Sequence, residues 1–196
     1  MSPWTPLLAA WFGEPADDLT RARRQAPLWW GKSEETDAWL RREFGALAAD
    51  AAAGRLDEWA HSPPGRLALI LLLDQLLRNL HRGSGAAFAQ DARARELCLE
   101  GLASGADQSL SALERVFFYL PLEHAESLPL QDRCVALFEA LAREQGPGLF
   151  DEYLDFARRH QAIIARFGRF PHRNAVLGRE SSEAELSFLT QPGSSF

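Results

Sequence analysis

The amino-acid sequence predicts an all-α fold in which antiparallel pairs of helices stack on one another. No segment shows a sustained alternation of polar and apolar residues, and no Asn-Gly turn joins two apolar runs, so signals for strands are nearly absent. Helix start and stop signals, in contrast, recur along the whole chain. The connections between them are short, which makes consecutive helices antiparallel neighbours.

The first half of the chain carries three such helices. The first is expected over 5–12, and a loop that holds Trp29 and Trp30 is expected to follow it. Ser33 can cap a second helix that runs to about residue 53. The pair Ser62-Pro63 places a cap before a proline at the first helical position, so a third helix is expected to run from there to about residue 82.

The second half of the chain predicts further helices, and Ser182 with Glu185 forms a capping box at the start of the last one. The expected ranges are 86–103, 109–120, 129–145, 149–167 and 183–190. With 196 residues, 46% of them hydrophobic, the chain can bury the core of one domain, and we expect a single all-helical domain over 1–196.

Composition excludes some classes of protein. The most apolar run, 67–73, is far shorter than the roughly 20 residues of a transmembrane helix. No signal peptide is visible at the start of the sequence, so a cytoplasmic location and no membrane association are expected. Cys98 and Cys134 lack metal-type spacing and are expected to be reduced core residues. No cofactor is indicated.

A basic segment on an acidic protein is the strongest functional signal. Residues 156–179 contain six arginines and no Asp or Glu, which gives them a charge of +6, whereas the whole chain has a net charge of -6. The arginines are Arg158, Arg159, Arg166, Arg169, Arg173 and Arg179. A local positive field on an acidic chain is more often a site for something negative than a solvated face.

The helix after Pro63 is apolar nearly all round in its first half and should therefore be central, but its second half is polar. Asp74, Arg78 and Arg82 follow one row of that helix at i, i+4 and i+8, with Asn79 beside them. Asp74 is expected to be at least partly buried and paired with Arg78. The row is either a structural ion pair or the lining of a pocket.

A second polar cluster is Pro121-Leu122-Glu123-His124-Ala125-Glu126, which directly follows an apolar helix. Glu123 and His124 could supply a general base with a carboxylate partner. The spacing is not that of a zinc helix, so a hydrogen-bonded histidine is favoured over a metal ligand and no metal site is expected.

His160 lies on the apolar stripe of its helix, which is marked by Tyr153, Phe156, Ile163, Ile164 and Phe167. It is therefore expected to be buried and hydrogen-bonded, either as a core histidine or as part of a site.

The segment after this helix is expected to be a constrained loop, because Gly168 can end the helix and Pro171 prevents its continuation. Arginines held on a constrained loop can present their planar guanidinium N–H donors to a carboxylate or a phosphate. The candidate ligands of that loop are Arg166, Arg169, His172, Arg173 and Asn174. The alternative is that these arginines pair with carboxylates such as Glu123, Glu126 and Asp74.

Several motifs together resemble the bacterial family catalogued as domain of unknown function 924. They are Trp11-Phe12-Gly13, Leu67–Gln75 with Arg78-Asn79 and Arg82-Gly83, Ala87-Phe88-Ala89 with Asp91, Glu114-Arg115, Pro121–Glu126 with Gln131, and Arg166–Asn174 with Leu177-Gly178-Arg179. The resemblance implies an all-α, tetratricopeptide-like right-handed array of helix pairs and no known activity. Leu77 departs from it, since a proline is expected there.

Three functions compete. The first is a pocket for a small anionic ligand, such as a phosphorylated compound, held by Asp74, the arginines and the two asparagines. Glu123, His124, His160 or His172 would transfer protons there in a hydrolase-like reaction. The second is a tetratricopeptide-like scaffold that binds an acidic peptide or partner protein in a groove. The third, RNA binding, ranks last because the net charge of -6 opposes wide phosphate contact. Whether the protein is an enzyme, and its oligomeric state, stay open.

Overall fold

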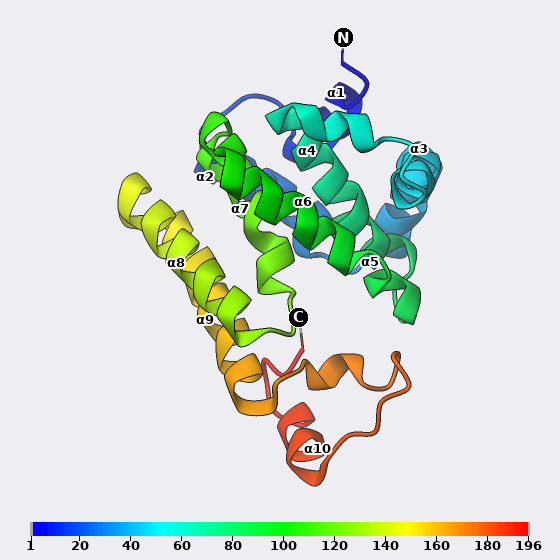
Figure 1. The fold of residues 1–196 in the computed structure, drawn as a ribbon, viewed down its shortest axis with the longest axis vertical. Helices are drawn as coiled ribbons and strands as arrows, with labels where there is room; N and C mark the ends of the chain where they lie inside the picture. Colours follow the sequence, from blue (N-terminus) through cyan, green and yellow to red (C-terminus); the bar gives the residue numbers. More distant parts are fainter. Residues whose placement is uncertain (1, 196) are drawn as a thin grey trace. The chain divides into compact units, whose positions relative to one another are not determined.

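The computed structural model describes residues 2–195, and it confirms the all-α class: none of these residues lies in a β-strand (Figure 1). The α-helices are α1 (Thr5–Phe12), α2 (Asp18–Trp30), α3 (Glu34–Ala52), α4 (Pro63–Ile70), α5 (Leu77–Leu80), α6 (Asp91–Ser104), α7 (Ala112–Glu123), α8 (Leu128–Gln145), α9 (Leu149–Phe167) and α10 (Glu183–Leu189). Short 3-10 helices cover Asp57–His61, Gly85–Phe88, Ala106–Ser109 and Pro171–Arg173.

These elements form two compact units. Unit 1 comprises the chain up to Arg82 together with Ala87–Pro121, and unit 2 comprises Gly83–Ala86 together with the chain from Leu122 onward. Whether the two units make up a single domain depends on how they pack together, so the single domain stays a prediction. The tetratricopeptide-like stacking likewise stays an expectation of the family resemblance.

The core of unit 1 is built around the central helix that Ser62 begins. The side chain of Ser62 accepts a hydrogen bond from the backbone N–H of Gly65 at 3.2 Å, which caps α4 as its sequence predicts. Every residue from Leu67 to Leu73 is at most 1% exposed, because neighbouring helices cover this apolar segment on all sides. Helix α6 packs on α4, and α3 packs on α5.

A π-helical turn, Leu71–Leu76, interrupts that central helix between α4 and α5. The helix expected to run to about residue 82 is therefore continuous to Leu80, but the sequence did not predict its π-helical turn. The widened turn contains Asp74, which is fully buried. It lies directly before Leu77, the position where the family resemblance implies a proline. The irregular geometry occurs here without a proline, and π turns are frequent at functional sites.

Helix α2 was not predicted, because the segment that ends in Trp29 and Trp30 was expected to be a loop. Pro27 lies inside the helix, near its end, and a proline in a helical pattern normally signals a break. The start of the helix is well defined, since the side chain of Asp17 accepts a hydrogen bond from the backbone N–H of Thr20 at 2.9 Å. Trp29 is buried and donates its Nε1–H to the carbonyl of residue 11.

Unit 2 contains a hairpin of two long helices, α8 and α9, that run side by side in Figure 1. Helix α9 has the boundaries that the sequence predicts, and Gly168 ends it with a left-handed φ of 70°. Tyr153, Ile163 and Ile164 form its buried stripe as expected. Phe156, however, is 47% exposed, so its place in the buried stripe was wrong. The guanidinium of Arg159 lies 5.2 Å from the Phe156 ring and covers it on the surface instead.

Candidate functional site

Unit 2 holds a buried pair formed by Glu123, at the end of α7, and His160, in the fourth turn of α9. His160 Nδ1 lies 2.9 Å from the carbonyl oxygen of Phe156 and 3.1 Å from Oε1 of Glu123. A carbonyl can only accept a hydrogen bond, so Nδ1 carries the hydrogen and Nε2 carries the lone pair of a neutral ring. The predicted burial of His160 is confirmed, since the residue is 5% exposed.

The environment keeps His160 neutral. Burial lowers its pKa to about 3, because the charged ring would lose its hydration. The carbonyl of Phe156 acts in the opposite direction, and the electrostatic effects of His124, Arg173 and His172 lower the pKa of His160 further. At neutral pH the ring is therefore a hydrogen-bonding group without charge.

Aromatic and cationic groups from the loop after α9 surround this pair. The ring of His160 lies 6.2 Å from that of His124 and 5.6 Å from that of Phe170, measured between centroids. The Phe170 ring is in turn 5.7 Å from the ring of His172. Arg173 is 6% exposed, its guanidinium lies 4.6 Å from the Phe170 centroid, and its Nη1 donates to the carbonyl of His124 at 3.2 Å. We call Glu123, His124, His160 and Arg173 the histidine cluster.

Gln131, on α8, fixes the backbone beneath the histidine cluster. Its Nε2 donates to the carbonyls of Glu123 at 2.6 Å and of Ala125 at 2.9 Å, and the side chain is fully buried. These two acceptors determine which end of the amide is nitrogen. The Oε1 atom then has no hydrogen-bond partner among residues 2–195. A buried acceptor in this condition is expected to bind a water or a ligand group.

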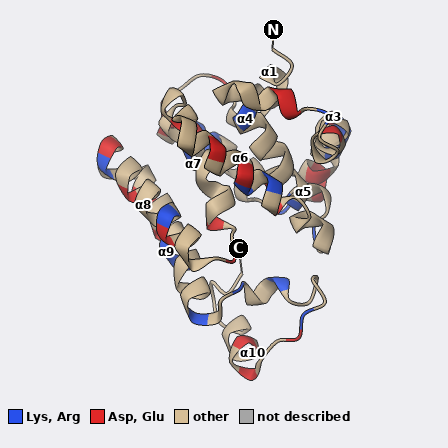
Figure 2. Cartoon of the chain, viewed as in Figure 1, with Lys and Arg blue, Asp and Glu red and all other residues tan. Residues whose placement is uncertain are grey.

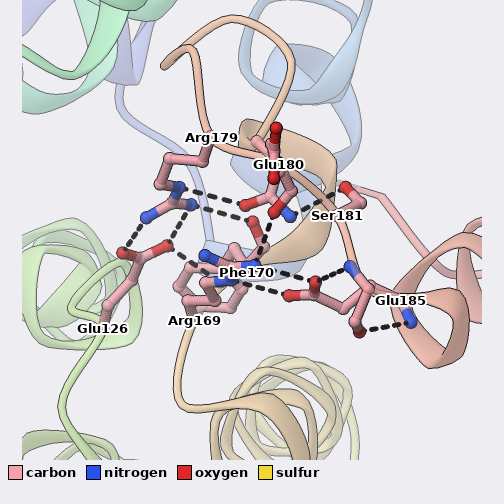
Figure 3. Close-up of polar contacts among 9 residues, drawn as sticks. Glu126, Arg169, Phe170, Arg179, Glu180, Ser181 and Glu185 are labelled. Atoms are coloured by element: carbon pink, nitrogen blue, oxygen red, sulfur yellow. Dashed lines mark hydrogen bonds and ion pairs between the residues drawn. The ribbon is translucent and has the colours of Figure 1, made fainter.

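Two arginines of the basic segment, in contrast, form internal ion pairs (Figure 3). Arg169 donates from Nε and Nη2 to the two carboxylate oxygens of Glu185, at 2.7 and 2.8 Å. Arg169 also donates to the carbonyl of Glu180 at 2.8 Å. These hydrogen bonds, first from Arg169 and then from the backbone of Ser182, hold the pKa of Glu185 well below its usual range.

Arg179 closes the other side of the same loop. Its guanidinium binds both carboxylate oxygens of Glu126, at 2.6 and 2.9 Å, and donates to the carbonyl of Phe170 at 3.2 Å. Glu126 also accepts the backbone N–H of Phe170 at 2.8 Å. Asn174, 1% exposed, accepts from Arg179 Nε at 3.0 Å and donates to Ser181 at 2.9 Å. Asn174 is thus engaged within the loop.

The remaining arginines of the segment lie on the surface of α9. Arg158 pairs with Glu139 at 2.8 Å and Arg159 with Asp155 at 3.5 Å. Arg166 is exposed, and its guanidinium lies 4.6 Å from the ring of Phe167. Figure 2 shows basic and acidic residues interleaved along α8 and α9. Carboxylates from elsewhere in unit 2 therefore offset much of the positive charge that the sequence concentrates in 156–179.

The candidate residues of the central helix lie in unit 1. The predicted pairing of Asp74 with Arg78 is confirmed, since Nη2 of Arg78 lies 3.4 Å from Oδ1 of Asp74. A stronger partner of Arg78 is Asp91, which accepts from both terminal nitrogens at 2.9 and 3.1 Å. Gln75 Nε2 donates to Asp74 at 2.6 Å. Burial lowers the pKa of Arg78, but Asp74 and Asp91 outweigh this effect and raise it, so the guanidinium stays charged.

Asn79 and Arg82 form a separate group with Asp37 of α3. Arg82 donates to both carboxylate oxygens of Asp37, at 2.7 and 2.9 Å, and Asn79 donates to it at 2.9 Å. The hydrogen bonds from Arg82 first, and then from Asn79, lower the pKa of Asp37 although partial burial raises it. Sequence reasoning did not find Asp37, because its only local signal, an acidic residue in the first turn of a helix, indicates a stabilised helix terminus.

The predicted site residues thus fall into a unit 1 set around Asp74 and a unit 2 set around His160. Whether the two sets together make one site stays a prediction. Sequence reasoning placed Gln131 only in the family motif and Glu185 only in the capping box of the last helix, so neither was a candidate site residue. Among residues 2–195, no three His, Cys, Asp or Glu side chains are grouped as metal ligands. None of the helices in this part of the chain has the length and apolar content to span a membrane.

Comparison with other proteins identifies the family but adds no activity. No curated protein matches the chain. A solved structure, that of a protein of unknown function from Agrobacterium tumefaciens, is similar to it with a TM-score of 0.74 and 36% sequence identity, over 88% of this chain and 98% of that one. The family model described as "Bacterial protein of unknown function (DUF924)" matches residues 7–193. The chain therefore belongs to the DUF924 family of bacterial proteins.

Proposed function

We propose that this protein binds a small anionic ligand, such as a phosphorylated compound, at the histidine cluster of unit 2. The supporting observation is the buried guanidinium of Arg173, 6% exposed, in a cluster with a buried carboxylate and two histidines. Burying ionisable groups costs several kcal/mol each unless they are compensated, so such clusters are concentrated at functional sites.

The chemistry of the cluster suits an anion. Arg173 supplies a permanent positive charge and planar N–H donors. The neutral ring of His160 is held by its Nδ1 hydrogen bond, which leaves Nε2 as its proton acceptor. An anion bound beside this ring would raise its pKa, since a nearby negative charge favours the protonated form. Proton transfer in a hydrolase-like reaction would then use His160 or His124, with Glu123 orienting the His160 ring.

The buried carbonyl oxygen of Gln131 adds a second requirement for the ligand. Because this atom has no hydrogen-bond partner among the described residues, a water or a ligand hydroxyl bound there would donate to it. A ligand that combines an anionic group with a hydroxyl group, as many phosphorylated metabolites do, would satisfy both Arg173 and Gln131.

Thermal unfolding in phosphate, sulfate and chloride at equal ionic strength tests the proposal. We expect phosphate and sulfate to raise the melting temperature of the wild type more than chloride does. The R173M variant should lose most of this difference. The matched control is R158Q, which removes an exposed arginine of the same unit that is paired with Glu139, and it should keep the wild-type response.

General salt exclusion also stabilises proteins in phosphate and sulfate, and it would act equally on all three proteins. Equal responses of wild type, R158Q and R173M would therefore rule out an anion site at Arg173. If R173M does not fold, the imidazole resonances of the wild type during a phosphate titration decide the question. A site at the cluster requires saturable shifts of the His124 and His160 resonances.

A further inference from the structure

Unit 1 has a depression of about 400 Å³ between the first turns of α3 and the end of α5, well away in sequence from the histidine cluster. Four of its lining residues follow one face of α3 at i, i+3, i+4 and i+7: Glu34, Asp37, Ala38 and Arg41. Asn79, Leu80 and Arg82 form the opposite side. Its volume lies in the range of small-molecule sites.

The floor of this depression is rigid and electrically balanced. Asp37 is 9% exposed, and it accepts two hydrogen bonds from Arg82 and one from Asn79. These bonds neutralise the carboxylate of Asp37 and hold the three side chains in place. The floor therefore carries no net charge that would select an anion or a cation by itself.

The rim, in contrast, presents hydrogen-bonding groups that the protein does not use. The carboxylate of Glu34 has no hydrogen bond or ion pair among residues 2–195. Arg41 uses only Nη2, which donates to the carbonyl of Leu80 at 2.7 Å. Its Nε and Nη1 donors stay available. Since Asn79 must turn its nitrogen toward Asp37, its Oδ1 faces away as an acceptor that forms no hydrogen bond in the described part of the chain.

The spacing of these groups defines a ligand with charge at both ends. Glu34 and Arg41 are seven residues apart on one helix face, so their Cα atoms are about 10 Å apart at 1.5 Å per residue. Both side chains can lean inward, which shortens the distance between the charged groups. An extended peptide of two or three residues spans about 7 to 10 Å between its termini.

We propose that this depression binds a short peptide of two or three residues by its free ends. The ammonium group binds Glu34, the terminal carboxylate binds Arg41, and a peptide N–H donates to Oδ1 of Asn79. The floor formed by Asp37 and Arg82 supplies no net charge, so recognition depends on both ends together. This site is built from residues of unit 1 alone, and the proposal does not depend on the anion site.

Isothermal titration calorimetry with Ala-Ala is the direct test. We expect saturable binding to the wild type, and weaker binding of N-acetyl-Ala-Ala and of Ala-Ala-amide, each of which lacks one terminal charge. E34Q and R41Q should each weaken Ala-Ala binding by about fivefold, which corresponds to the roughly 1 kcal/mol of one exposed charge pair. E34Q should also abolish the penalty for the acetylated peptide, and R41Q the penalty for the amide.

R42Q is the matched control, because Arg42 is the next residue of α3, is exposed, and is paired with Glu43 outside the depression. It should bind Ala-Ala as the wild type does. All the substituted residues are exposed on α3, and circular dichroism verifies the fold. The proposal is wrong if Ala-Ala gives no saturable heat at millimolar concentration, if the blocked peptides bind equally well, or if R42Q has the same effect as R41Q.

Discussion

The Nδ1 atom of His160 lies 2.9 Å from the carbonyl oxygen of Phe156, to which it is hydrogen-bonded, and 3.1 Å from Oε1 of Glu123. Phe156 precedes His160 by one turn of α9, so the first bond fixes the ring within its own helix. The contact with Glu123 joins α9 to the end of α7. These two contacts hold a neutral histidine in the interior of unit 2.

The stability of the protein should depend on His160 below pH 6.5. The pKa of this ring is about 3 in the folded protein and 6.5 without its environment, so only the unfolded chain takes up this proton between those values. The contribution to the free energy of unfolding is complete above pH 6.5 and falls by about 1.4 kcal/mol per pH unit below it. Urea unfolding between pH 5 and 7.5 measures this slope.

The H160Q variant is the comparison, because glutamine can still donate to the Phe156 carbonyl but does not titrate. Its free energy of unfolding should be lower than that of the wild type at pH 7.5, and the difference should shrink as the pH falls. Parallel curves for the two proteins would show that His160 has an ordinary pKa.

Sulfate should stabilise the wild type more at pH 5 than at pH 7. Sulfate does not titrate in this range, so a stronger effect at low pH must come from groups on the protein. An anion bound at Arg173 would raise the pKa of His160, and by linkage a proton on His160 would strengthen anion binding. Melting temperatures in sulfate and chloride at both pH values measure this coupling. A sulfate effect that is independent of pH, or equal in H160Q, would contradict it.

Arg78 should be one of the most sensitive positions of unit 1. Asp74 is fully buried, and Arg78 is ion-paired both with it and with Asp91. We expect R78M to lower the free energy of unfolding by about 3 to 5 kcal/mol, as removal of one partner of a buried ion pair does. Urea unfolding at pH 7 measures the loss. R93M, which breaks exposed pairs with Asp57 and Glu96, should cost at most about 1 kcal/mol; a comparable loss in both variants would refute the prediction.

Glu185 should hold the segment after α9 in place. The E185Q variant removes the charge that pairs with Arg169, and hydrogen exchange of the backbone amides in 169–190 should become faster. E183Q changes an exposed acid in the same turn of α10 and should leave the exchange rates unchanged. Because the folded-state pKa of Glu185 is lowered, its stabilising effect is present above pH 4.5 and is lost as the pH falls below that value. Unchanged exchange in E185Q would show that this ion pair does not hold the segment.

The sequence determined the local structure where a single residue or short motif controls the backbone. Gly168 ends α9, Ser62 caps α4, and Ser182 with Glu185 caps α10, each at the expected position. Such residues act on backbone groups within one helical turn, so both partners of each contact lie a few residues apart in the sequence. Helix α2 escaped prediction because Pro27, which normally breaks a helix, is tolerated inside its last turns.

The tertiary structure decided which arginines of the basic segment form ion pairs within the protein. The sequence showed six arginines in a segment, 156–179, that contains no Asp or Glu, yet Arg169 pairs with Glu185 and Arg179 pairs with Glu126, 53 residues away. The burial of His160 followed from the helical period, but its partner Glu123 belongs to another helix. Ion pairs and pKa values depend on distances of a few ångströms and on loss of hydration, and both are set by packing between segments that are remote in the sequence.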